Sequence, residues 1–430
     1  MNSDIEMFNP LSDFQKSLQL IPVNSSIYDI NLIDESEETN KAVPDVSKTD
    51  LQSLPEIDPS SISIDLDKGF LLTLENYYTK SRKQYDVVEK IPEKTDLQEL
   101  KTRKQQDKTV VGFNKLQFDH LSDQLASLPP HSTLEVVSFD FTEPVEVNKP
   151  VHIVANPTST VSVNGDKDCL TCNAFNVVIE NFNFIYDGIQ PNSAAKILNG
   201  DVTFINCRFS CKQAHTIFAT NSSNATFINC EFTSATNESQ IFVDGNAMVT
   251  LQTCKVNSAS KNGIVAKNKS SLKVFDTEIT MNNQNGVELQ DSASALFSNC
   301  NISINSLNGL LIKSNSSNIM LVGNEISNHQ NGYGTTLDKS KCTFISNKFL
   351  NNQKGAIFAN SESSIVSEHN EFQVTESTSL TSNPFSKDAT HIIKISQKSK
   401  GTSREDQFSL CKAENTIVVE NNSVFEGIGL

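Results

Sequence analysis

A repeat of 23 or 24 residues constrains the fold of this chain more than any other feature. Segments such as Asn229-Cys230-Glu231-Phe232 recur, and their second positions are residues 207, 230, 254, 277, 300, 324, 347 and 370. Neighbouring numbers differ by 23, 24, 23, 23, 24, 23 and 23. A period of this length is typical of a solenoid, in which each unit stacks on the unit before it.

Within one unit the apolar residues alternate, which indicates strands rather than helices. The step from Phe227 to Cys230 breaks the alternation, so we expect the strand to bend there. Two apolar columns result. The first comprises Phe204, Phe227, Leu251, Val274, Phe297, Leu321, Phe344 and Val366, and the second Phe209, Phe232, Val256, Ile279, Ile302, Ile326, Phe349 and Phe372. Stacked at about 4.8 Å per coil, these columns predict a parallel β-helix of about eleven coils from residue 131 to 430.

Between the apolar columns lies a third column of small residues, which we call the ladder. Its members are Cys207, Cys230, Cys254, Thr277, Cys300, Asn324, Asn347 and Asn370. We expect these side chains to point inward without forming disulfides, with the Asn amides hydrogen-bonded along the column. A buried structural thiol is the favoured interpretation over a metal or redox site.

Asn-Gly pairs at 262–263, 285–286, 308–309 and 331–332 predict a turn in each coil. We expect the glycines of these pairs to supply a positive φ.

Composition narrows the function classes. The formal net charge is −16, which disfavours nucleic acid and anionic membranes as partners. No apolar stretch is long enough to span a membrane, and the acidic start predicts no secretory signal. The nine cysteines are therefore expected to be reduced thiols in a cytoplasmic protein. No motif calls for a cofactor.

Residues 1–112 have the composition of a mostly disordered acidic tail with short helices. The first 50 residues hold ten acidic and three basic side chains and only short apolar islands. One island, Ile30, Leu32 and Ile33 followed by acidic residues, resembles a SUMO-interacting motif, which would add a strand to a partner's sheet. The alternative is a solvated segment with a few apolar residues.

Residues 113–430 are expected to form a capping helix and the β-helix. Phe118, Leu121, Leu125 and Leu128 lie on one helical face before Pro129, so we expect residues 113–129 to cap the first coil. The phrases 143–154 and 177–184 resemble the pectin-lyase-like right-handed β-helix family. The resemblance implies a right-handed helix from about 131 to 430 and says little about activity.

Near the end, residues 416–424 match the pattern of 364–372, which is 52 residues away. The sequence therefore predicts two polar insertions in the last coil, near 374–389 and 397–412.

Catalytic motifs of the family are missing from the sequence. The Asn-Thr-Asp, Asp-Asp, Gly-His-Gly and Arg-Ile-Lys strings of polygalacturonase-like enzymes do not occur, and there is no Trp for an esterase motif. Acidic Glu231, Glu278 and Glu325 interleave with Lys255 and Lys348, which indicates charge pairing between coils. Cys169 and Cys172 have the spacing of half a zinc site, without a second half. The prediction is no catalytic, cofactor or metal site.

The expected function is that of a non-enzymatic scaffold, as in the protein-binding β-helix modules of F-box-type and cytoskeleton-associated proteins that the chain resembles. The partner would be a protein, and the location the cytoplasm, with association to the cytoskeleton or a cilium. One alternative is a divergent carbohydrate-active enzyme. Another is a structural component of a large assembly.

Overall fold

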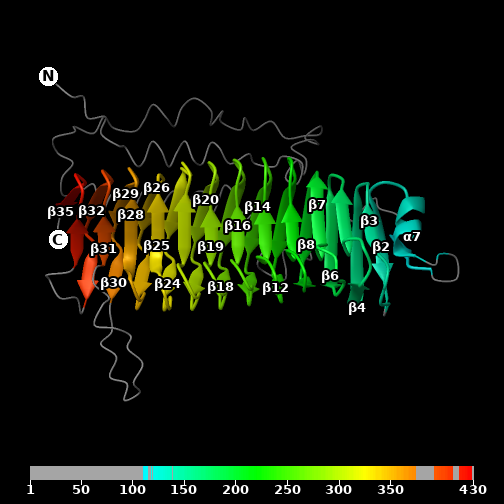
Figure 1. Cartoon of the computed structure of the whole chain (residues 1–430). Coiled ribbons are helices and arrows are strands. Elements are labelled where there is room, and N and C mark those ends of the chain that lie inside the picture. Colours follow the sequence, from blue (N-terminus) through cyan, green and yellow to red (C-terminus); the bar gives the residue numbers. More distant parts are fainter. Residues whose placement is uncertain are drawn as a thin grey trace, which may run out of the picture. The chain divides into compact units, whose positions relative to one another are not determined.

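The computed structural model describes residues 110–114, 118, 120–137, 139–373, 392–409 and 416–428, all within one compact unit of the chain. These residues form a right-handed parallel β-helix whose coils follow one another in chain order from helix α7 to strand β35 (Figure 1). The predicted fold class is confirmed. The predicted number of coils was too low, because the solenoid has about 13 turns. No helix in the described ranges is long and apolar enough to cross a membrane.

The described residues form two sheets, of which sheet A is the larger with 23 strands. Each regular coil contributes a strand of about five residues and a strand of about three, joined by a bend. The strands are β1 (Val110–Gly112), β2 (Ser132–Val136), β4 (Val151–Val163), β6 (Val177–Tyr186), β8 (Asp201–Ile205), β9 (Arg208–Cys211), β11 (Asn224–Ile228), β12 (Glu231–Thr233), β14 (Met248–Gln252), β15 (Lys255–Asn257), β17 (Ser271–Phe275), β18 (Glu278–Thr280), β20 (Ser294–Ser298), β21 (Asn301–Ser303), β23 (Ile319–Val322), β24 (Glu325–Ser327), β26 (Lys341–Ile345), β27 (Lys348–Leu350), β29 (Ser364–Glu368), β30 (Glu371–Gln373), β32 (Lys400–Arg404), β33 (Gln407–Ser409) and β35 (Val424–Ile428).

Sheet B has 12 strands, one for each coil it crosses. They are β3 (Val145–Val147), β5 (Leu170–Asn173), β7 (Ala195–Asn199), β10 (Ile217–Ala219), β13 (Ile241–Val243), β16 (Ile264–Ala266), β19 (Val287–Leu289), β22 (Leu310–Lys313), β25 (Tyr333–Asp338), β28 (Gly355–Asn360), β31 (Ile393–Ile395) and β34 (Ile417–Val419). In β10, β13, β19 and β31 of sheet B the first and third residues are buried and the middle one is half-buried, as in Ile217, Phe218 and Ala219, whereas all three residues of β16 are buried. This alternation gives the sheet one core face and one outer face.

The core is a continuous stack of the two apolar columns. Phe204, Phe227 and Phe297 of the first column are fully buried. Rings of adjacent coils stack, with centroids of Phe204 and Phe227 5.0 Å apart and those of Phe349 and Phe372 5.1 Å apart. The first column was assigned one residue wrongly, because Phe344 pairs with Ser367 and not with Val366.

The predicted bend between Phe227 and Cys230 is present, and a left-handed residue makes it. Asn229 has φ 52° between β11 and β12, and the residue before each ladder position repeats this conformation. Asn tolerates left-handed backbone better than other residues with a Cβ. The corner thus explains why Asn precedes Cys in several repeats.

A cap covers the first coils, but it differs from the prediction of one helix over 113–129. Helix α7 spans Leu121–Ser127 and buries Leu121 and Leu125. Residues Val110–Gly112, which the sequence placed in the tail, form β1 and pair in parallel with β2. The Gln124 amide joins the two parts, because Nε2 donates to the Gly112 carbonyl at 2.9 Å.

The end of the solenoid corrects the predicted insertions. Strand β32 pairs with β29 at an offset of 36 residues, from Ser364 to Lys400, and β35 pairs with β32 at an offset of 24. The long coil therefore holds 13 residues beyond a 23-residue repeat, and its predicted insertion at 374–389 lies outside the described residues. The predicted insertion at 397–412 was wrong, since 400–409 continue sheet A in register. Residues 417–419 pair in sheet B with Ile393–Ile395, and so 416–424 do not match 364–372.

Candidate functional site

The ladder residues lie at the bend between the two sheet-A strands of each coil. Each is at most 2% exposed. These are Cys207, Cys230, Cys254, Thr277, Cys300, Asn324, Asn347 and Asn370. Strand pairing places them one above another with one member in each coil. The structure thus brings together side chains that are as much as 163 residues apart, from 207 to 370.

Cys and Asn side chains in this column donate the same hydrogen bond, to a backbone carbonyl of the preceding coil. The Cys254 thiol donates to the Phe227 carbonyl at 3.4 Å, and the Asn324 amide donates to the Phe297 carbonyl at 3.1 Å. Both carbonyls belong to the first apolar column of the preceding coil. Each inward donor therefore has a backbone acceptor in the preceding coil, so its polar hydrogen is not left unpaired by burial.

Thr277 and the Asn residues also accept, as Thr277 Oγ1 does from Cys254 N at 3.2 Å. Asn324 Nδ2 donates to Asn347 Oδ1 at 2.8 Å, and Asn347 Nδ2 donates to Asn370 Oδ1 at 2.9 Å. The chain of amides continues to Asp406, whose Oδ1 accepts from Asn370 N at 2.8 Å. Sequence reasoning missed Asp406 because it stands 36 residues after Asn370, beyond the long coil.

Two of the ladder thiols, Cys230 and Cys300, have a pKa that burial raises. The eight described cysteines are free and buried, and burial raises the pKa of Cys300 to about 12 and the pKa of Cys230 well above its ordinary value. A thiol with a raised pKa is a poor nucleophile and a poor metal ligand. Burial likewise raises the pKa of Cys172 to about 12. Among the described residues, no three His, Cys, Asp or Glu side chains lie close enough together to hold a metal ion.

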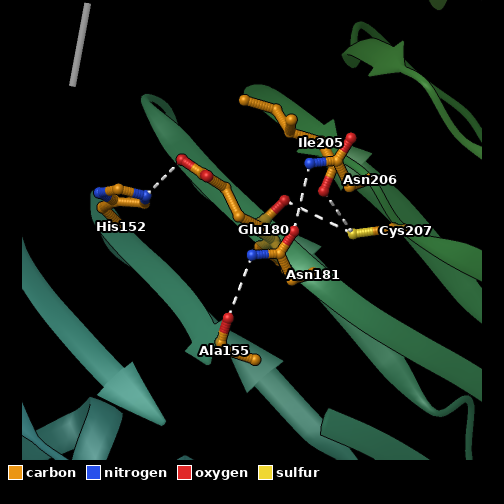
Figure 2. Close-up of polar contacts among 8 residues, drawn as sticks. His152, Ala155, Glu180, Asn181, Ile205, Asn206 and Cys207 are labelled. Carbon is orange, nitrogen blue, oxygen red and sulfur yellow. Dashed lines mark hydrogen bonds and ion pairs between the residues drawn. The ribbon is translucent and has the colours of Figure 1, made fainter. Parts of the chain in front are cut away.

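Polar side chains also surround the coil of Cys207, the first ladder residue (Figure 2). Asn206 Nδ2 donates to Asn181 Oδ1 at 3.2 Å, and Asn181 Nδ2 donates to the Ala155 carbonyl at 3.1 Å. Beside them His152 Nε2 lies 2.8 Å from Glu180 Oε1, and both side chains are largely buried. This contact joins neighbouring strands, because His152 lies on β4 and Glu180 on the adjacent β6.

A second ladder runs through the turns that precede sheet B, and the sequence analysis did not recognise it. Asn282, Asn305, His329 and Asn352 are buried there. Asn282 Nδ2 donates to Asn305 Oδ1 at 2.9 Å, and Asn305 N donates to His329 Nδ1 at 3.2 Å. The repeated Asn-Gly signal reflects this packed turn.

The glycines of those pairs do not have the positive φ that was predicted. Gly263, Gly286 and Gly309 have ordinary backbone, but a Cβ on Gly286 would lie 2.8 Å from both Asn305 Nδ2 and the Gly309 carbonyl oxygen. Close packing of one turn on the next therefore excludes a side chain. Gly332 does not continue the column, because Gly334 packs against Gly309 instead.

The short strands of sheet A present an outer row of polar residues, which we call the charged strip. It consists of Arg208, Glu231, Lys255, Glu278, Asn301, Glu325, Lys348 and Glu371. Three ion pairs join adjacent coils, with Arg208 3.1 Å from Glu231, Lys255 3.9 Å from Glu278 and Lys348 3.6 Å from Glu371. These exposed pairs contribute little stability each.

The outer face of sheet B has a different chemistry. The middle residues of its strands pair in one row, which we call the outer sheet-B column. Its members are Lys196, Phe218, Phe242, Val265, Glu288, Leu311, Thr336, Phe358 and Lys394. Five of these nine side chains are apolar on a face that the core does not need.

Two clusters of aromatic side chains include residues of this column. In the first, the Phe242 ring stacks with Phe218 at 5.4 Å and with His215 at 4.5 Å between centroids, and Lys267 Nζ lies 4.7 Å from the Phe242 centroid. Burial lowers the pKa of His215, so the imidazole is neutral near pH 7.

In the second cluster, Tyr333 and Phe358 stack at 5.1 Å, and Lys394 Nζ lies 6.0 Å from the Phe358 centroid. Neither cluster was identified from the sequence. The apolar residues at 218, 242, 265 and 311 each follow a buried Ile or Leu, so they look like extra core residues until the register is known.

The candidate interaction motif Ile30, Leu32 and Ile33 lies outside the described residues. The candidate site therefore consists of the outer sheet-B column and its two ring clusters, whereas the ladder joins adjacent coils within sheet A.

Comparison with known proteins agrees with this architecture. The family described as "Right handed beta helix region" matches residues 239–382. The A-module of the Azotobacter vinelandii mannuronan C-5 epimerase AlgE4 superposes with a TM-score of 0.51 at 10% identity, covering 71% of this chain and 91% of that chain. The A-module of the AlgE6 epimerase from the same organism gives 0.50 at 10% identity, with 71% and 93% covered.

A search among curated proteins gives no match. At 10% identity the likeness to the two epimerase modules concerns the fold alone. The matched region and the two superpositions agree with the right-handed β-helix fold described above.

Proposed function

We propose that this protein is a non-enzymatic β-helix scaffold that binds a protein partner through the outer sheet-B column. The observation that carries the proposal is the contrast between two outward rows of the same solenoid. The charged strip of sheet A is polar at every coil, whereas sheet B presents the half-buried Phe218, Phe242, Leu311 and Phe358, with Val265 buried among them. Apolar rings on the outer face of a stable protein mark an interaction site.

The arrangement of the rings suits a protein interface. Phe242 and Phe358 are five coils apart along the sheet, which corresponds to about 24 Å at about 4.8 Å per coil. Two aromatic anchors at this separation fit within one interface of standard size, where a few rings supply most of the binding energy. The strands hold the anchors rigidly, so binding orders little of the scaffold.

Charge on this face is nearly balanced, which favours a protein over a strongly anionic polymer. Lys313 Nζ lies 2.6 Å from Glu288, and Lys394 Nζ lies 3.2 Å from Glu420. Lys196 is 3.9 Å from Asp168. A polyanion would have to compete with these internal carboxylates at three of the lysines around the column.

The test is a comparison of captured proteins between the full chain and the double variant Phe242→Ser/Phe358→Ser. We expect a partner that is recovered with the natural chain and reduced at least tenfold with the variant, measured by quantitative mass spectrometry. The matched control is Lys255→Ser/Lys348→Ser on the charged strip, which should keep this partner. Equal recovery with both double variants would contradict the proposal.

A carbohydrate ligand is the second candidate, because stacked rings flanked by lysines also suit a sugar ring. The fold is shared with two mannuronan epimerase modules, which supports testing mannuronan itself. Calorimetric titration of the purified chain with mannuronan, followed by NMR of the polymer, separates the cases. Binding that Phe242→Ser abolishes would identify a glycan-binding face, and altered sugar stereochemistry would identify an enzyme. The cytoplasmic and cytoskeletal location stays a prediction, which cell fractionation with an antibody against the natural chain would check.

A further inference from the structure

Two large apolar side chains are exposed in an unfavourable backbone conformation beside the middle coils of the charged strip. The residue after each short sheet-A strand from β12 to β27 has a left-handed φ. The series is Ser234 (64°), Ser258 (60°), Met281 (55°), Ile304 (56°), Asn328 (57°) and Asn351 (51°). Four members are small or amide residues that suit this conformation. Ile304 is β-branched, and a positive φ is a genuine outlier for such a residue.

Neither apolar residue is explained by the core. Met281 is 54% exposed, Ile304 is 47% exposed, and Leu307 in the same turn as Ile304 is 38% exposed. Met281 and Ile304 stand on adjacent coils, because Glu278 pairs with Asn301 three residues before each of them. A strained, exposed Ile where a Ser or Asn would serve the fold indicates a contact with another molecule.

The charges beside these residues specify which molecule fits. Along the charged strip the signs run plus, minus, plus, minus, neutral, minus, plus and minus from Arg208 to Glu371. Two copies of a strip can pack antiparallel about a two-fold axis, and the position of the axis decides which charges meet. An axis through the coil of Asn301 would oppose Lys255 to Lys348 and Glu278 to Glu325, and every such meeting is repulsive.

An axis half a coil away, between the coils of Met281 and Ile304, reverses this result. Lys255 then faces Glu325 of the second copy, and Lys348 faces Glu231 of the second copy. Arg208 faces Glu371 of the second copy by the same symmetry. Other half-coil positions give fewer opposite pairs and leave the apolar residues off the axis.

We propose that two copies of this chain pair antiparallel through the charged strip, with Met281 of each copy against Ile304 of the other. Apolar contacts lie at the centre, and opposite charges surround them on both sides, which is the usual anatomy of a specific interface. From Arg208 to Glu371 the strip spans seven coil steps, about 34 Å.

Light scattering on the full chain tests the association. We expect a dimer at micromolar concentration whose dissociation constant rises with added salt, because ion pairs flank the contact. Ile304→Asn should give a monomer with an unchanged or higher thermal midpoint, since Asn suits the left-handed backbone. The control Ile189→Asn, at a site 85% exposed elsewhere, should remain a dimer. A monomeric natural chain, or a dimeric Ile304→Asn variant, would overturn the proposal.

Cross-linking tests the register. Lys255→Cys on one copy and Glu325→Cys on another should form an intermolecular disulfide when the two proteins are mixed under mild oxidation. Lys255→Cys alone should not, because its two copies would be three coils, about 14 Å, apart across the axis. Equal cross-linking of Lys255→Cys with itself would rule out this register. These readouts concern self-association, so they are independent of the partner that sheet B binds.

Discussion

At the scale of single residues, the ladder works through one donor and one acceptor per coil. A Cys thiol supplies the donor to the carbonyl of the preceding coil, as Cys300 does to Val274 at 3.4 Å. An Asn amide supplies that donor and also accepts from the neighbouring coil, as Asn324 Oδ1 does from Cys300 N at 2.9 Å. The Asn section from 324 to 370 is therefore the more strongly connected part of the ladder.

Substitution of Asn347 by Leu should destabilise the protein by about 1–3 kcal/mol, because Asn324 and the Leu321 carbonyl lose buried partners. Asn324→Leu should have an effect of similar size. Urea unfolding of each variant measures this change. The control Asn283→Leu alters an exposed side chain and should leave the midpoint nearly unchanged. If Asn347→Leu matched that control, the amide chain would carry no net stability.

His329 is the weak member of the second ladder. Nδ1 accepts from Asn305 N, while Nε2 has no hydrogen-bond partner among the described residues. Asn at this position could accept the same bond and donate to a carbonyl, as Asn352 Nδ2 does to Ile326 at 3.0 Å. We expect His329→Asn to be at least as stable as the natural chain at pH 7, as measured by urea unfolding.

The same residue should make stability depend on pH. Burial lowers the pKa of His329 to about 3 in the folded state, from an ordinary value of 6.5. The unfolded chain therefore binds a proton between these values and the folded chain does not, so stability falls as pH drops below about 6.5. The loss approaches about 1.4 kcal/mol per pH unit. Unfolding at pH 7, 6 and 5 should show a smaller decline for His329→Asn, and parallel curves would contradict this assignment.

At the scale of elements, the turn before sheet B requires glycine, because the next coil leaves no room for a side chain. Gly286→Ala should destabilise by about 1–3 kcal/mol, because the new Cβ meets Asn305 and the next backbone at 2.8 Å. Gly165→Ala is the matched control, since no atom lies within 4 Å of its Cβ. Thermal unfolding compares the two. A stable Gly286→Ala protein would mean that neighbouring turns separate at little cost.

Much of the element pattern follows from the sequence because the repeat is strict. Residues 23 or 24 positions apart had to stack, which placed the ladder and the two apolar columns between 204 and 349. The same reasoning failed where the period changed. The 36-residue coil displaced Asp406 from the expected position, and a local likeness then matched 416–424 to the wrong strand.

The candidate site was harder to predict for a physical reason. Phe218 and Phe242 lie on strands of three residues, where alternation is too short to separate an inward from an outward apolar side chain. The Asn-Gly pairs were informative about a turn but misleading about its cause. Steric contact with the next coil, which a single coil does not reveal, explains those glycines.

At the scale of the whole molecule, the boundary of the solenoid decides what can be removed. Val111 and Phe113 pack against the core, and β1 pairs with β2, so residues 110–112 belong to the fold. The composition of residues 1–109, which lie outside the described ranges, predicts that the core does not need them. Deleting 1–109 should keep the thermal midpoint, whereas deleting 1–112 should lower it by several degrees. Equal midpoints for both deletions would show that β1 is dispensable.

The tail is expected to act through a partner instead. If Ile30, Leu32 and Ile33 add a strand to another protein's sheet, deletion of 1–109 should remove one binding partner while the folded core persists. Capture with the full chain and with the deleted chain measures the difference. Identical partner sets would show that this segment is only a solubilising spacer.

The ladder has a direction, and this limits how the protein can grow by duplication. Each amide from Asn324 to Asn370 donates one N–H toward the C-terminal coil, and Asp406, whose side chain has no amide N–H, accepts the last of these bonds. A copied Asn coil inserted before 370 would join this series without leaving a donor unused. A copied coil after 406 would meet a side chain that has no amide N–H to continue the series. Coil number can therefore change upstream of Asp406 at little cost, and this aspartate marks the end of the repeat that duplication can extend.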